Sequence, residues 1–91
     1  MFDIKKFTAF IAFNDDLRNL YYDQAESMGI NSTWDVYHIQ DGTELPSPEE
    51  IEIMKDVFET KIQINKELHF EYSTADSDFR RKVSSKVRNR G

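Results

Sequence analysis

The apolar residues of the first 28 positions fall at helical intervals, and this pattern limits the fold more than any other feature of the chain. They follow one another mostly in steps of three, four and their multiples: Ile4, Phe7, Phe10, Ile11, Leu17, Leu20, Tyr21, Ala25 and Met28. Asp3 and Asn14 are residue types that cap helix N-termini, and Gly29 suits a helix C-terminus. The sequence therefore predicts two consecutive helices, over about residues 3–13 and 15–28.

The segment Ser47-Pro48-Glu49-Glu50 is the clearest helix start in the chain. It has a capping serine, a proline in the first turn and a glutamate three residues after the cap, which together make a capping box. A helix over about 48–60 follows, with an apolar face formed by Ile51, Met54, Val57 and Phe58, and with Ile53 beside it. Residues 32–40 are compatible with a strand or with a short helix capped by Asn31 or Ser32, and the short helix is favoured.

Beyond residue 60 the apolar period changes to two. Ile62 and Ile64 alternate with polar residues, as do Leu68, Phe70 and Tyr72, and residues 65–67 between them can form a turn. This alternation predicts a β-hairpin, with a longer helix through Leu68 as the alternative. A last helix, capped by Thr74 or Ser77, would carry Phe79, Val83 and Val87 along one side and the ion pairs Asp76–Arg80 and Asp78–Lys82. The predicted fold class is α+β: one mostly helical domain over 1–91, with one β-hairpin and a basic C-terminal helix.

Catalytic and metal-binding patterns are missing from the sequence. The chain has no cysteine, which excludes disulfides, thiolate zinc sites and thiol catalysis. His38 and His69 are the only histidines and lack metal-ligand spacing, and His69 would face solvent in the predicted strand. The apolar run Phe7–Phe13 is only seven residues long, lacks a small-x-small cleavage site and is followed at once by Asn14-Asp15-Asp16, so we expect no signal peptide. No stretch is long enough to span a membrane. We therefore expect a cytoplasmic protein that is not an enzyme and needs no metal or cofactor.

Charge is divided unevenly along the chain. All 17 acidic residues lie between Asp3 and Asp78, and only six basic residues accompany them, so residues 1–79 carry a net charge of −11. Residues 80–91 carry six basic residues and no acid. This division indicates an electrostatic partner rather than a reaction.

The predicted helix over 48–60 carries an ordered series of carboxylates. Glu49, Glu52, Asp56 and Glu59 are separated by three, four and three residues, so they form a stripe along one face, which we call the acidic row. Successive members would lie about 5 Å apart along the axis, comparable to but shorter than the phosphate spacing of one nucleic-acid strand. The spacing fits the solvated face of any amphipathic helix equally well. A second acidic cluster, on the helix over 15–28, contains Asp15, Asp16, Asp23 and Glu26.

In its size, charge division and acidic row, the chain resembles the anti-restriction DNA-mimic (Arn-like) proteins of T-even bacteriophages. The resemblance implies a dimeric inhibitor whose carboxylates occupy the DNA-binding cleft of a restriction nuclease or nucleoid protein, in the host cytoplasm, with no direct binding of nucleic acid. The basic segment 80–91 departs from a uniformly acidic mimic. Exposed aromatic residues, with Trp34 and Tyr37 among them, also favour a homodimer. The alternative function is a nucleic-acid or ribonucleoprotein accessory protein that acts through the basic C-terminal helix.

Overall fold

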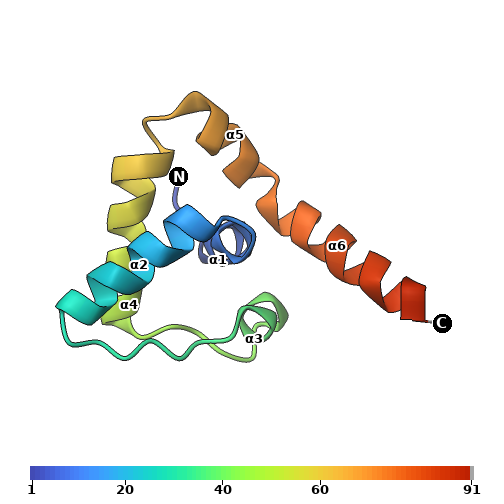
Figure 1. The fold of residues 1–91 in the computed structure, drawn as a ribbon, viewed down its shortest axis with the longest axis horizontal. Helices are drawn as coiled ribbons and strands as arrows, with labels where there is room; N and C mark the ends of the chain where they lie inside the picture. The colour runs from blue at the N-terminus through green and yellow to red at the C-terminus, as the bar shows by residue number, and fades with distance from the viewer. Residues whose placement is uncertain (91) are drawn as a thin grey trace.

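The chain folds as an array of helices around one central helix (Figure 1). The computed structural model describes residues 1–90, with side chains described through Val83. Helices make up 72% of the structure, and no strand occurs in residues 1–90, so the predicted α+β class is wrong. In chain order the elements are α1 (Ile4–Ala12), α2 (Asp15–Ser27), α3 (Val36–Asp41), α4 (Pro48–Val57), the π-helical turn η1 (Phe58–Ile62), α5 (Lys66–Ser73) and α6 (Ala75–Arg90).

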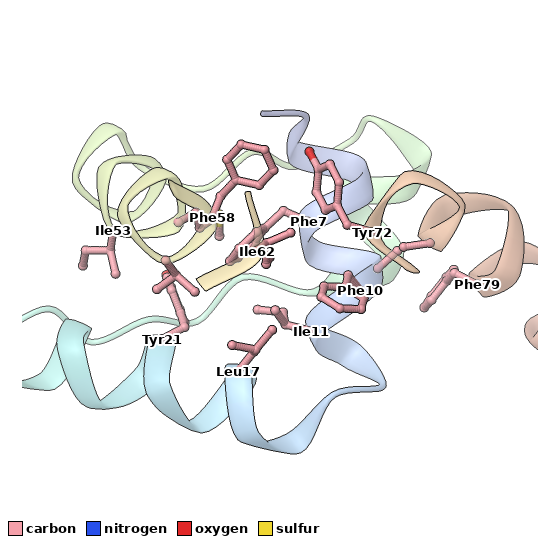
Figure 2. Packing of buried hydrophobic residues seen from close by; sticks show 14 of the residues in the cluster. Phe7, Phe10, Ile11, Leu17, Tyr21, Ile53, Phe58, Ile62, Tyr72 and Phe79 are labelled. Carbon is pink, nitrogen blue, oxygen red and sulfur yellow. The ribbon is translucent and has the colours of Figure 1, made fainter. Parts of the chain in front are cut away.

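Helix α1 is the centre of the arrangement and packs against α2, α3, α4, α5 and α6. Its five consecutive residues from Phe7 to Ile11 are buried, because the other helices surround this stretch of α1. Thr8 satisfies its buried hydroxyl by donating to the Ile4 carbonyl oxygen at 2.9 Å. The apolar run near the N-terminus is therefore the middle of the core, where Phe7, Phe10 and Ile11 meet side chains from the other helices (Figure 2).

The two predicted N-terminal helices are confirmed, together with their caps. The Asp3 carboxylate accepts a hydrogen bond from the Lys6 amide at 3.0 Å, and the Asn14 side chain accepts one from the Leu17 amide at 3.0 Å. Gly29, just beyond α2, has a φ of 74°, which is the left-handed conformation that favours glycine at this position.

The short helix favoured for residues 32–40 is confirmed as α3, but its cap is neither Asn31 nor Ser32. The Asp35 carboxylate accepts from the Tyr37 amide at 2.7 Å and so begins the helix one turn later than expected. Gly42 ends it with a φ of 82°.

The β-hairpin predicted beyond residue 60 is wrong. After Val57 the helix widens into η1, where the Gln63 amide donates to the Phe58 carbonyl oxygen at 2.8 Å, five residues back. The Asn65 side chain then caps α5 by accepting from the Leu68 amide at 3.1 Å. The alternating apolar residues do not share a face, since Ile62 is fully buried while Ile64 is 78% exposed.

The last helix is confirmed as α6, which begins after Thr74 and extends away from the other helices at its far end (Figure 1). Its predicted ion pairs are wrong. Asp78 accepts instead from Arg81 at 3.2 Å, and the Lys82 Nζ lies 4.1 Å from the centre of the Phe13 ring. The predicted position of the Val87 side chain lies outside the described side chains. No helix in residues 1–90 is both long and apolar enough to cross a membrane.

The N-terminal segment is held by a tyrosine from α5. The Tyr72 hydroxyl accepts from the Asp3 amide and donates toward the Met1 and Asp3 carbonyl oxygens, at 3.3 and 3.2 Å. Burial raises the pKa of Tyr72 to about 12, because the phenolate would lose its hydration. This contact ties the start of the chain to the C-terminal end of α5.

Candidate protein-interaction surface

The acidic row lies on the solvent face of α4 and its continuation. Glu49, Glu52 and Asp56 are exposed on α4, and Glu59 is exposed in η1. The opposite face of α4 is buried through Ile53, Met54 and Val57. At about 1.5 Å per residue, the row extends roughly 15 Å along the helix axis. The sequence therefore placed these four carboxylates on the correct side of the helix, although the last of them lies beyond the α-helical part.

The carboxylates of the acidic row are not neutralised by neighbouring cations. Among the described side chains the ion pairs join Arg18 to Asp15, His38 to Glu44 and Arg81 to Asp78, and none involves the row. Lys55 is the only basic residue within the segment 49–59, and it too is exposed and outside these pairs. The row therefore presents fixed negative charge to solvent along its whole length.

The second acidic cluster lies on the helix that packs against α4. Asp15, Asp16, Asp23 and Glu26 are exposed on α2, whose other face is buried through Leu17, Tyr21 and Ala25. Helices α2 and α4 are in contact (Figure 1), so the helix with the second acidic cluster lies beside the helix with the acidic row. Arg18 partly offsets the α2 cluster through its bond to Asp15.

Glu50 has a structural role that the sequence revealed only in part. Its carboxylate completes the predicted capping box by accepting from the Ser47 amide at 2.9 Å, and its second oxygen accepts from the Ser32 hydroxyl. The hydroxyls of Ser32 and Tyr21 are 2.7 Å apart, and the Trp34 indole N–H donates to Tyr21 at 3.1 Å. Burial by itself would raise the pKa of Glu50, but the hydrogen bonds from Ser32 and Ser47 outweigh it and lower the pKa. Glu50 therefore joins α2, the 30–35 segment and α4 and is not part of the exposed acidic surface.

Three aromatic side chains border a hollow beside this network. Tyr22, Trp34 and Tyr37 line a surface cavity of about 300 Å³ whose lining also includes Asp35 and Arg18. The sequence indicated Trp34 and Tyr37 as candidates for an interface but did not group them with Tyr22. The grouping depends on the 30–35 segment, which brings Trp34 back onto α2.

The basic C-terminal segment is only partly described. Arg80, Arg81 and Lys82 are exposed, and two of these three interact within the chain, with Asp78 and with Phe13. The side chains of Lys86, Arg88 and Arg90 lie outside the described residues.

The histidines do not form a metal site in the described part of the chain. There, no group of three or more histidine and carboxylate side chains could hold a metal ion. The His38 Nδ1 lies 3.6 Å from a Glu44 oxygen. His69 packs near the rings of Phe58 and Tyr72, with centroids 6.4 and 6.2 Å away, because it lies on α5 rather than on the predicted strand.

Comparisons with known proteins add no family to this description. The chain matches no protein-family model, no curated protein and no solved structure.

Proposed function

We propose that the protein is a non-enzymatic inhibitor that binds a DNA-binding protein, such as a nuclease or nucleoid protein, by presenting carboxylates in place of DNA phosphates. The observation that carries this proposal is the acidic row, in which Glu49, Glu52, Asp56 and Glu59 are exposed and outside every ion pair of the described side chains. Such an inhibitor would act in the cytoplasm of the cell that contains its partner.

The electrostatic argument starts from the cost of holding like charges together. Crowded carboxylates repel one another and lower the stability of the folded chain, and a cation close to each would relieve that repulsion. Arg18 and Arg81 form such ion pairs elsewhere, whereas no ion pair among the side chains described through Val83 involves the row. A cleft that binds DNA carries lysine and arginine arranged for phosphates, and it would supply the missing positive charge.

A homodimer would extend this acidic surface and cover apolar side chains that the monomer exposes. Ile64 and Phe70 are 78% and 71% exposed, and both lie on the η1–α5 side of the molecule. Where exposed apolar residues form one patch, that patch marks a site of contact with another protein. We therefore include a second copy of the chain among the expected partners.

Affinity capture with matched variants tests the proposal. The wild-type protein is immobilised beside the row variant Glu52→Lys/Asp56→Lys/Glu59→Lys, and bacterial lysate is passed over both. The control variant is Asp41→Lys/Glu67→Lys/Glu71→Lys, which makes the same change in net charge at exposed residues outside both acidic groups. Both variants are first shown to be folded by circular dichroism.

The expected result is a DNA-binding protein that wild type and control retain, that added duplex DNA displaces, and that the row variant does not retain. Equal retention by the row variant would contradict the proposal, as would a captured protein that DNA does not displace.

A further inference from the structure

The hollow bordered by Tyr22, Trp34 and Tyr37 lies where α1, α2 and α3 meet. We call it the aromatic hollow. Apolar Ile11 and Val36 contribute to its lining, and Tyr22 and Tyr37 keep 38% and 52% of their surface exposed. Its volume of about 300 Å³ is at the lower end of the range for ligand pockets, which suits one side chain rather than a whole cofactor.

The walls of the aromatic hollow are held in place from behind. The Trp34 indole N–H donates to the buried Tyr21 hydroxyl at 3.1 Å, and the Trp34 and Tyr22 rings are nearly parallel, with 13° between their planes. The Tyr37 ring packs on Phe79 of α6 with centroids 5.4 Å apart. Because these contacts already restrict the rings, a ligand would lose little binding free energy to ordering them.

The charges around the aromatic hollow favour a cation. Arg18 is the one basic residue of its lining, and its guanidinium is already engaged by the Ala12 carbonyl oxygen at 2.9 Å and by the Asp15 carboxylate. Asp35 contributes a carboxylate to the lining, and Glu44 lies next to it, accepting from the Asp35 amide at 3.0 Å. The lining itself holds one carboxylate and one cation, that cation is already paired with Asp15, and Glu44 adds a second carboxylate beside the lining.

No cation of the described side chains lies over a ring of the hollow. Among the described side chains, the cation that lies over a ring is Lys82, and its ring is Phe13, outside the hollow. Tryptophan and tyrosine faces attract cations through the negative charge at the centre of the ring. Arginine has an advantage over lysine there, because its guanidinium is planar, stacks on aromatic rings and is more weakly hydrated.

We propose that the aromatic hollow binds a cationic side chain of the partner protein, an arginine in preference to a lysine. The proposal deepens the proposed function and rests on it, since a protein that binds DNA presents such side chains. In this arrangement the acidic row attracts the partner over a distance, and the aromatic hollow holds one of its arginines in contact.

Trp34 makes the proposal directly measurable, because it is the only tryptophan of the chain and forms a wall of the hollow. The probes are capped pentapeptides with arginine, lysine or citrulline between glycines, titrated to millimolar concentration while Trp34 fluorescence is recorded. Citrulline keeps the shape of arginine and removes its charge. We expect the arginine peptide to bind about two- to fivefold more tightly than the citrulline peptide, the range of an exposed cation–aromatic contact, with lysine between them.

Two variants separate a site in the hollow from general attraction to an acidic protein. Tyr37→Ala removes one wall and should weaken arginine binding about two- to fivefold. Asp35→Asn keeps a residue that caps α3 while removing the charge, so it should weaken the arginine peptide and leave the citrulline peptide unchanged. Met28→Ala, an exposed apolar residue outside the hollow, is the control and should change neither.

Equal responses to arginine and citrulline, no Trp34 response, or arginine binding unchanged in both Tyr37→Ala and Asp35→Asn would overturn the proposal. The peptide titrations are independent of the test of the proposed function, which uses retention of a DNA-binding protein and the row variant. Row-dependent capture without an arginine preference at Trp34 would leave the inhibitor and remove the aromatic hollow from its mechanism.

Discussion

Replacing Ser32 by alanine should weaken the fold through the polar network beside α4. The Ser32 hydroxyl donates to the Glu50 carboxylate and lies 2.7 Å from the Tyr21 hydroxyl, so its removal leaves a buried carboxylate with one fewer donor. Hydrogen bonds to charged groups contribute about 1.5–3 kcal/mol, and we expect a loss of unfolding free energy in that range at neutral pH.

The effect should depend on pH in a defined direction. Because the folded pKa of Glu50 lies below its ordinary value of 4.5, the carboxylate stabilises the fold at pH above 4.5. That contribution is lost as the pH falls through the folded pKa, since the protonated acid no longer gains from the Ser32 donor. The stability difference between wild type and Ser32→Ala should therefore be largest at neutral pH and shrink under acid conditions.

Urea unfolding followed by circular dichroism at neutral and acid pH measures both quantities. Ser27→Ala is the control, because its hydroxyl donates to a backbone carbonyl on the exposed side of α2, and it should stay within about 0.5 kcal/mol of wild type. A Ser32→Ala protein as stable as the control would refute the role given to the network. A stability difference that does not vary with pH would refute the assignment of its origin to Glu50.

Three further predictions follow from the N-terminal anchor, the basic segment and the exposed apolar residues. Tyr72→Phe should lower the unfolding free energy by about 1–3 kcal/mol, because the Asp3 amide loses its acceptor, and unchanged stability would contradict this role of Tyr72. Ultraviolet titration of the wild type should show one tyrosine that ionises only near pH 12. In gel-shift assays at physiological salt the intact protein should leave duplex DNA unshifted, because residues 1–79 carry a net charge of −11 from 17 acidic and six basic residues. A shift that deletion of 84–91 abolishes would instead support the nucleic-acid accessory function. Phe70→Ser should dissociate the proposed homodimer in sedimentation velocity runs, and a wild-type protein that is monomeric at all concentrations would exclude that dimer.

The sequence was sufficient to predict the start of a helix wherever that start depends on residues within one turn of it. Asp3, Asn14 and the Ser47–Glu50 capping box each satisfy backbone groups next to themselves, so their roles could be predicted without the fold. Ser32 could not be predicted in this way. Its hydroxyl bonds to Glu50, 18 residues further on, which left Asp35 to cap α3.

The hairpin failed as a prediction because spacing alone does not show which apolar residues are buried. Ile62 and Ile64 alternate as strand residues do, yet one faces the core and the other faces solvent. Phe58 and Ile62, four residues apart, are both buried through the π-helical turn η1, which is a helical spacing and not a strand spacing. Tertiary packing therefore determined the secondary structure of this segment.

The acidic row was accessible to sequence reasoning because an amphipathic helix fixes its own solvent face. Ile53, Met54 and Val57 determine which side of α4 is buried, and the carboxylates occupy the other side. The aromatic hollow was not accessible, since Tyr22, Trp34 and Tyr37 come from α2, an irregular segment and α3. Their grouping depends on the packing of all three segments around α1.

The salt dependence of partner binding tests the central claim most directly. The affinity of the captured protein for wild type, for Glu52→Lys/Asp56→Lys/Glu59→Lys and for the control Asp41→Lys/Glu67→Lys/Glu71→Lys is measured over a range of salt concentrations. If the row replaces DNA phosphates, wild type and control should show the same steep loss of affinity with salt, and the row variant should bind weakly with a much shallower dependence. The same affinity and the same salt dependence for all three proteins would contradict the account.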